Sequence, residues 1–457
     1  MKYRHAVPLL VALTAAGLLF SQAQYVSSLD YPARDPGVRD GPDDAGGPLD
    51  GLTRTELAFF RLGRDDFEEA EAADEGLGPT MNLDGCGGCH SQPAIGGTSP
   101  AVNPQVAFAN KDGARNRIPP FISIDGPVRE ARFVRNRDGS PDGGVHALFT
   151  IAGRYDAPGC QLEQPDFEAE LARRNVIFRI PTPVFGAGLI EQIPDSAILA
   201  NQTRDADIKA WLGIRGRPNI VLAFGAVSGQ PNLNGNDGTV ARFGWKAQNK
   251  SLLLFSGEAY NVEMGITNEM FQTERDETET CQFATVPNDV QNMEAGDALE
   301  GTTAIQNFAN FQRFLAPPKA SPDTPGGAAS IGRGRSLFAN IGCALCHTPS
   351  LRTGNATVAA LRYQRVNLYS DLLVHDMGVA LADGVSQGQA GPREFRTAPL
   401  WGLGKRLFFL HDGRTSDLME AIRAHASSGS EANAVVSNYY KLRESEKQDL
   451  LNFLRSL

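Results

Sequence analysis

Apolar side chains recur with the period of an α-helix in three stretches of the chain. Residues 55–70 (TELAFFRLGRDDFEEA) carry apolar positions at helical spacing and predict an amphipathic helix. Residues 334–341 (GRSLFANI) are typical of the end of a short helix. Residues 445–457 repeat the helical pattern, and we expect this terminal helix to pack across the start of the C-terminal domain.

Short strand-like runs lie at residues 147–152, 176–180 and 219–224, separated by Gly and Pro. The stretch at 317–327 (PPKASPDTPGG) is typical of a linker, and it separates residues 24–316 from residues 328–457. The pattern therefore predicts a mainly α protein whose longer, N-terminal unit carries a β-rich insertion.

One internal similarity crosses that boundary. Residues 245–259 (WKAQNKSLLLFSGEA) align with residues 411–425 (HDGRTSDLMEAIRAH), each with a polar turn followed by an amphipathic helix. Two domains derived from one ancestor would produce such a similarity.

The N-terminus has the features of an export signal. Lys2, Arg4 and His5 form a basic start, an apolar run follows, and Ser21-Gln22-Ala23 supplies small residues for cleavage. We expect residues 1–23 to be a signal peptide and the mature protein to be periplasmic, with no membrane span; an uncleaved anchor is the alternative.

Composition narrows the class of partner. Hydrophobic residues make up 41% and charged residues 21%, as in soluble globular proteins. The net charge of −10 argues against nucleic acid, because phosphate binding needs clustered basic residues. An acidic surface suits a basic protein partner.

Four of the six cysteines form two CxxCH motifs, Cys86-Gly87-Gly88-Cys89-His90 and Cys343-Ala344-Leu345-Cys346-His347. This spacing lets two thiols on one turn form thioethers with the vinyl groups of one haem, while the histidine becomes the proximal iron ligand. A zinc site would need further Cys or His pairs, and neither motif has one nearby. The sequence predicts two covalent haems c, ligated by His90 and His347, in two cytochrome c-like domains.

The remaining cysteines, Cys160 and Cys281, are an even remainder in a protein expected to enter an oxidising compartment. Both lie beside polar, turn-rich sequence, which favours a disulfide between them. Two unrelated buried thiols are the alternative.

Longer strings carry a family resemblance. They include GLGPTMNLDGCGGCHSQPAIGG, PTPVFGAGLIEQIP, ARFGWKAQ, MGITNEMF, DLLVHDMGVALADG, FRTAPLWGLG and LHDGRTSDLMEAIRAH. In these the chain resembles the di-haem oxidoreductases, often labelled thiol oxidoreductases. That family is related to bacterial di-haem cytochrome c peroxidases and to the di-haem enzyme that matures methylamine dehydrogenase.

The resemblance implies a division of labour between the haems. In related peroxidases one haem collects electrons from a donor, the other cleaves hydrogen peroxide, and a tryptophan between them aids coupling. Trp245 matches that tryptophan, although by itself it is as well explained as a core residue.

The resemblance also implies a second ligand for the C-terminal haem. His425 stands where related peroxidases have methionine and the maturation enzyme has tyrosine. Ligation by His347 and His425 departs from the peroxidase pattern and generally lowers the reduction potential. The alternative for His425 is a surface histidine near a helix C-terminus.

The sixth ligand of the N-terminal haem stays open between three hypotheses. His146, in GGVHALFTIAGR, and Met264, in VEMGITNEM, are candidates, and an open position for peroxide is the third. In the open case Glu263 matches an acidic residue of the relatives and can move a proton during O–O cleavage.

Further expectations follow from the family strings. His375 is a candidate for hydrogen bonding to a haem propionate, and His411 has no clear role; each is otherwise a structural histidine. Related peroxidases hold a calcium ion between their domains, and the carbonyl groups of Thr397 and Pro399 could contribute to such a site.

Three functions are therefore weighed. The leading hypothesis is an oxidoreductase that reduces hydrogen peroxide, by heterolytic O–O cleavage at the haem ligated by His90, with electrons from a small redox protein. The second is a non-catalytic electron carrier with two six-coordinate irons. The third is an oxidase of a protein or thiol substrate, for which the sequence shows no free reactive cysteine.

Overall fold

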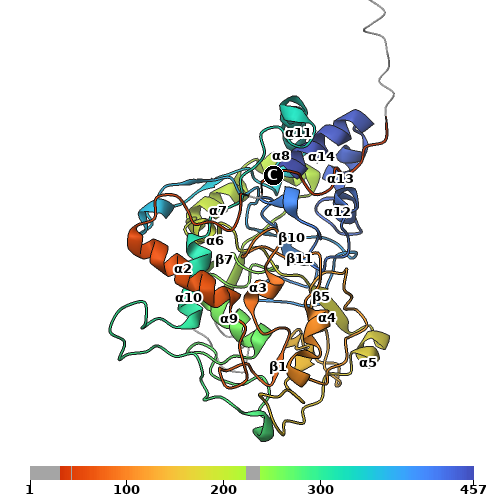
Figure 1. Ribbon diagram of the computed structural model, residues 1–457. Helices are drawn as coiled ribbons and strands as arrows, with labels where there is room; N and C mark the ends of the chain where they lie inside the picture. Colours follow the sequence, from red (N-terminus) through yellow and green to blue (C-terminus); the bar gives the residue numbers. More distant parts are fainter. Residues whose placement is uncertain (1–30, 43, 223–236) are drawn as a thin grey trace, which may run out of the picture.

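The computed structural model describes residues 31–42, 44–222 and 237–457 (Figure 1). The predicted signal peptide and residues 223–224 lie outside the described residues. The helices are α2 (Arg54–Glu68), α3 (Cys86–Cys89), α4 (Gln105–Phe108), α5 (Phe167–Ala172), α6 (Ala187–Glu191), α7 (Asp195–Thr203), α8 (Ala206–Leu212), α9 (Leu252–Met264), α10 (Ala304–Phe314), α11 (Gly327–Asn340), α12 (Leu418–Ala424), α13 (Asn433–Tyr440) and α14 (Glu444–Ser456). The strands are β1 (Thr80–Met81), β2 (Glu130–Phe133), β3 (Val145–His146), β4 (Phe149–Thr150), β5 (Val176–Arg179), β6 (Asn219–Leu222), β7 (Asp237–Ala241), β8 (Leu351–Arg352), β9 (Arg365–Val366), β10 (Val374–Asp376) and β11 (Glu394–Arg396).

The fold is mainly α, as expected: helices hold 32% and strands 11% of the described residues. The strands pair antiparallel in small sheets, the largest of which has the order β3-β2-β5. The predicted strands at 147–152, 176–180 and 219–224 overlap β4, β5 and β6. Within the described ranges, none of the helices combines the length and apolar character that a membrane span requires.

The helix before each CxxCH motif packs on a second helix that comes later in the chain. In the first pair, α2 begins at a capping box made by Thr53 and Glu56, and its Phe67 packs on Phe311 of α10 with ring centroids 5.0 Å apart. In the second, α11 packs on the terminal helix α14, as predicted for residues 445–457. Figure 1 shows α2, α9 and α10 grouped apart from α11, α13 and α14.

Each pair crosses at a glycine. A Cβ atom on Gly63 of α2 would lie 2.1 Å from the Asn307 carbonyl oxygen of α10, and one on Gly334 of α11 would lie 2.0 Å from that of Asp449 of α14. Any larger side chain would push the helices apart. The helix before each cysteine motif therefore crosses its partner helix closely at a glycine.

The internal sequence similarity has a structural counterpart. An isolated antiparallel bridge joins Phe243 to Asn249, and another joins Phe409 to Thr415. The first bridge is followed by α9, which begins at Leu252, and the second by α12, which begins at Leu418. Bridge and helix keep the register of the sequence alignment.

Two long-range connections close the fold. A disulfide joins Cys160 to Cys281, as the sequence favoured. The first described residues contact the terminal helix α14: the Asp35 carboxylate accepts two hydrogen bonds from the Arg455 guanidinium, at 2.7 and 2.6 Å. Residues far apart in the sequence are therefore joined at both connections.

Candidate functional site: two cavities joined by a tryptophan

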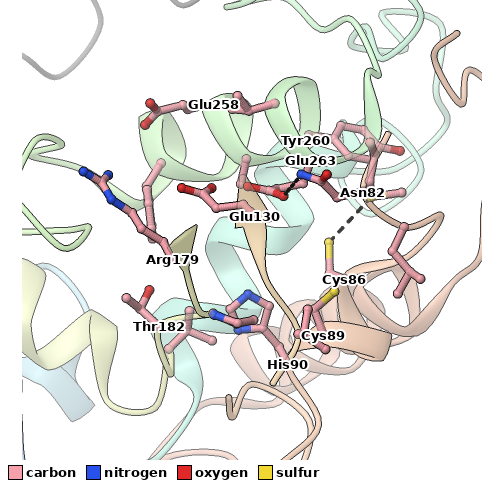
Figure 2. Close-up of a pocket in the computed structure, with 18 of the residues that line it drawn as sticks. Asn82, Cys86, Cys89, His90, Glu130, Arg179, Thr182, Glu258, Tyr260 and Glu263 are labelled. Carbon is pink, nitrogen blue, oxygen red and sulfur yellow. Dashed lines mark hydrogen bonds between the residues drawn. The ribbon is translucent and has the colours of Figure 1, made fainter. Parts of the chain in front are cut away.

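The first CxxCH motif opens onto a cavity. Helix α3 carries Cys86 and Cys89, and His90 follows it; all three line a space of about 1160 Å³, which also includes the cavity's open mouth. Strands β2 and β5 and helix α9 complete the walls, and Figure 2 shows Glu130 and Glu263 facing His90 across the cavity.

His90 is held in the form that a metal ligand requires. Its Nδ1 lies 2.9 Å from the Gly97 carbonyl oxygen, and a carbonyl can only accept, so Nδ1 carries the proton. Burial lowers the pKa of His90 to about 4, which keeps the ring neutral at pH 7. Its Nε2 is therefore free to bind iron, with the orientation fixed from behind.

Two carboxyl groups share the opposite wall. Burial and the charge of Glu130 raise the pKa of Glu263 well above its usual range. Burial acts in the same sense on Glu130, but Arg132, 2.6 Å away, outweighs it and the pKa of Glu130 falls to about 2. Asn82 donates a hydrogen bond to Glu263 at 2.7 Å. The pair thus holds one proton, which lies on Glu263, and one negative charge.

The second CxxCH motif lines a separate cavity of about 1450 Å³, again including its mouth. His347 and His425 both line it. Nδ1 of His347 donates to the Tyr369 carbonyl at 3.1 Å, and Nδ1 of His425 donates to the Ala421 carbonyl at 2.7 Å. Burial lowers the pKa of both rings, so two neutral imidazoles are available in one cavity.

Polar atoms without partners fit both cavities to an anionic cofactor. Among the described residues, Nε of Arg179 in the first cavity and the hydroxyl of Tyr439 in the second are buried without a hydrogen bond. The guanidinium of Arg406, which is 9% exposed, lines the second cavity, and burial lowers its pKa to about 10. Buried groups of this kind call for a counter-charge, and haem propionates would supply it.

Trp245 connects the two cavities, because its side chain lines both. Its indole N–H donates to the Ile180 carbonyl at 2.9 Å, which fixes the ring. The His411 ring meets it edge-on at a centroid distance of 6.4 Å and lines the second cavity. Trp245 and His411 occupy equivalent positions of the internal repeat.

His146 does not line the first cavity. Its ring stacks on Phe133 at 3.7 Å, and its Nε2 bonds to the Asp142 carboxylate at 2.9 Å. Both the ring face and the nitrogen that could bind iron are thereby engaged elsewhere. The proposal of His146 as a ligand would require these contacts to break.

Met264 lines the first cavity, but its sulfur lies 4.0 Å from Sγ of Cys86. The thioether therefore packs at the edge where the motif attaches its cofactor. In Figure 2 the groups that face His90 are instead Glu130 and Glu263.

His375 lines the second cavity, but its ring lies between two carboxylates. Nδ1 is 2.8 Å from Glu431 and Nε2 is 3.0 Å from Asp371, and the side chain is almost fully buried. Because both nitrogens are occupied by carboxylates, the suggested propionate contact of His375 has no free donor in this arrangement.

Two features of the cavities were not anticipated from the sequence. Ala259 of α9 lines the first cavity at the position that aligns with His425, and Arg406 lines the second. Comparing the two copies of the repeat residue by residue would have identified Ala259. Arg406 carried no sequence signal, because nothing in the sequence distinguishes a buried arginine among 43 lysines and arginines.

Two cavities, each with a CxxCH motif and a backbone-oriented histidine, define a protein that holds two cofactors in contact through one aromatic side chain. Residues 130–457 match the family described as "Di-haem oxidoreductase, putative peroxidase". The chain belongs to that di-haem family, as its sequence resemblance indicated.

Other comparisons are weaker. No curated protein matches the chain. Among solved structures, hydrazine synthase from Kuenenia stuttgartiensis is 17% identical, with 35% of this chain and 56% of that chain covered and a TM-score of 0.23. A di-haem peroxidase from Burkholderia thailandensis is 14% identical over 47% of this chain and 65% of its own, with a TM-score of 0.28. A variant of that peroxidase is 14% identical, with 60% of this chain and 86% of that chain covered and a TM-score of 0.29. Scores at this level do not establish a shared fold.

Proposed function

We propose that this protein is a periplasmic c-type di-haem oxidoreductase that reduces hydrogen peroxide with electrons from a small redox protein. Cys86 and Cys89 would attach one haem and Cys343 and Cys346 the other, with His90 and His347 as the iron ligands. The family match supports the two haems and the oxidoreductase class. The basic and apolar start of the chain supports export.

The carrying observation is a difference between the two repeats. His425 lines the C-terminal cavity together with His347, whereas the equivalent residue in the N-terminal cavity is Ala259. A methyl group cannot bind iron. One haem would thus have two imidazole ligands and transfer electrons, and the other would keep a position for substrate.

The residues around that position suit peroxide. A haem iron with an open position binds peroxide and promotes cleavage of the O–O bond. Glu263 holds a proton within the cavity, Glu130 holds the matching charge, and Asn82 fixes the Glu263 carboxyl. Glu263 would donate its proton to the departing peroxide oxygen as a general acid, and the Glu130–Glu263 pair would take up the proton that the other oxygen loses.

Substitution of Ala259 by histidine tests this directly. Ala259→His should place an imidazole where the second repeat has His425, convert the N-terminal iron to a six-coordinate, low-spin state, and abolish peroxide turnover with a reduced small c cytochrome as donor. Low-temperature EPR of the ferric protein reads the spin state. Val290→His adds the same group at a site that is 49% exposed and lines neither cavity, so it should change neither result.

The wild-type protein discriminates between the functions before any variant is made. A high-spin together with a low-spin ferric signal and steady-state turnover is the expected result. Two low-spin signals and no turnover at any redox poise would instead identify an electron carrier.

A further inference from the structure

Lys246, the residue after Trp245, is an entirely buried cation. Its side chain is 0% exposed. The ammonium donates to the carbonyl oxygens of Gly391 at 3.0 Å and Glu394 at 2.9 Å, and lies 3.1 Å from the Asp383 carboxylate, which is also 0% exposed. The ring of Phe395 covers it at 4.0 Å from the centroid. Carbonyl and carboxylate oxygens around one positive charge are the surroundings that a hard metal ion prefers.

The residues expected for calcium, Thr397 and Pro399, do not belong to this cage. The Thr397 carbonyl, which was expected to contribute, accepts a hydrogen bond from the Ser370 hydroxyl at 2.6 Å. Pro399 lies on the wall of a small cavity beside Trp245. In the described part of the chain, no group of three or more His, Cys, Asp or Glu residues is arranged to hold a metal. The oxygen cage that does exist, directly before Thr397, contains the Lys246 ammonium.

The cage is connected to the first cavity. Asp383 binds Lys246 through one carboxylate oxygen and the Arg179 guanidinium through the other, at 2.8 Å. Arg179 lines the first cavity, where its Nε is without a partner. One buried carboxylate therefore joins Lys246 to a residue that faces the first cofactor.

The cage is also connected to the second cavity and to the tryptophan. Phe395, which covers the ammonium, stacks on His411 at 4.2 Å, and both rings line the second cavity. The backbone of Trp245 accepts a hydrogen bond from Arg396, and that of Lys246 accepts one from Asn219. The ammonium thus clamps residues 391–395 to the segment that presents the indole ring.

We propose that Lys246 is the resident cation between the two haem cavities and that it positions Trp245 for electron transfer between the haems. The inference rests on the two-haem part of the proposed function and is independent of the oxidant. Burial lowers the pKa of Lys246 to about 8, against the opposing charge of Asp383, so the ammonium is charged at pH 7.

Two substitutions separate the charge from the hydrogen bonds. Lys246→Met removes both, and Lys246→Gln removes the charge while keeping donors for the carbonyl groups. Because a buried positive charge favours the reduced state, both variants should shift the midpoint potentials of the haems downward. Only Lys246→Met should also lose the fast phase of electron transfer between the haems, because Trp245 is no longer clamped.

Lys209 provides a matched control. It is 8% exposed, and its ammonium donates to the Asn201 and Gln202 carbonyls, but it lines neither cavity. Lys209→Met should cost folding stability as Lys246→Met does, while leaving potentials and electron-transfer kinetics unchanged. Equal behaviour of the two methionine variants in the redox measurements would overturn the proposal.

A third arm needs no variant. The wild-type potentials and kinetics, measured by spectroelectrochemistry and by flash reduction, should be the same with calcium and with EGTA. Loss of fast electron transfer in EGTA, restored by calcium, would show that a metal ion and not Lys246 holds the site. None of these measurements contains peroxide, so a protein without peroxidase activity still tests the inference.

Discussion

Among substitutions that leave the charge unchanged, we expect replacement of Glu263 to cause the largest loss of peroxide turnover. Burial keeps it protonated, so Glu263→Gln preserves its neutrality and its hydrogen bonds to Asn82 and Glu130 while removing the transferable proton. We expect peroxide turnover to fall on the order of 10²–10⁴-fold, the usual contribution of general acid–base catalysis. Steady-state kinetics and the haem spectrum measure activity and integrity together.

Glu274 is the control for that substitution. Burial raises its pKa to about 7, yet it lines neither cavity. Glu274→Gln should leave turnover intact. Equal losses in both variants would mean that the effect reflects removal of any buried carboxyl and not a role for Glu263.

His425 is expected to be the second axial ligand of the C-terminal haem. Removing its imidazole by His425→Ala should leave that iron five-coordinate and add a second high-spin signal to the EPR spectrum of the ferric protein. His146→Ala is the comparison, because His146 bonds to Asp142 outside both cavities. A changed spectrum in His146→Ala, with none in His425→Ala, would reverse the two assignments.

These residues differ in how far the sequence could predict them. Each CxxCH motif holds both haem-attaching cysteines and the ligating histidine in five consecutive residues, so it is recognised from the sequence alone. His146 shows the opposite case: its Gly-rich setting makes it a candidate haem ligand, but its ring stacks on Phe133 and bonds to the Asp142 carboxylate. Which neighbours a histidine meets depends on tertiary packing, which no local pattern records.

At the scale of elements, the Glu71 carboxyl links the loop after α2 to helix α9, because the Tyr260 hydroxyl donates to it at 2.7 Å. Burial raises the pKa of Glu71 from 4.5 to about 7, and nearby acidic residues add to the effect. The protonated form is thus favoured by folding. Its stabilising contribution is complete below the unfolded value of 4.5 and is lost as pH rises through about 7.

Glu71→Gln should therefore weaken the pH dependence of thermal stability. Between about pH 5 and about pH 8 the wild-type melting temperature should fall relative to that of the variant, which cannot ionise at this position. Asp74→Asn removes an exposed carboxylate from the same loop and should leave the wild-type profile unchanged. Parallel wild-type and Glu71→Gln profiles would contradict the assignment.

Elements with a strong local period were predictable, and those without one were not. Helices α2 and α14 follow their amphipathic patterns to within a few residues. Residues 31–41 have no period, and their place on the C-terminal helices depends on the ion pair of Asp35 with Arg455, 420 positions away. No local pattern in residues 31–41 predicts a contact over that distance.

For the whole molecule, the internal repeat relates the two sites that one side chain joins. In both parts the helix before the cysteine motif crosses a later helix at a glycine, and an isolated bridge is followed by a helix, α9 or α12. Trp245 and His411, equivalent in the repeat, meet each other where the halves face. Divergence at two other equivalent positions, Ala259 and His425, then makes the two cavities chemically unequal.

This arrangement makes the bridging indole a point that a whole-molecule measurement can probe. Trp245→Phe keeps an aromatic ring between the cavities but removes the indole N–H bond to Ile180 and part of the ring that spans them. We expect electron transfer between the haems to slow. Both haems should stay bound with unchanged ligands, because His90 and His347 are oriented by other backbone carbonyl groups, those of Gly97 and Tyr369. Stopped-flow reduction, followed at the absorbance of each haem, measures the transfer rate.

Trp401→Phe is the control, because it alters a buried tryptophan that lines neither haem cavity. It should leave the rate of electron transfer unchanged. If Trp245→Phe transfers electrons as fast as the wild type, the path between the cavities does not pass through the indole, and the neighbouring His411 becomes the side chain to replace.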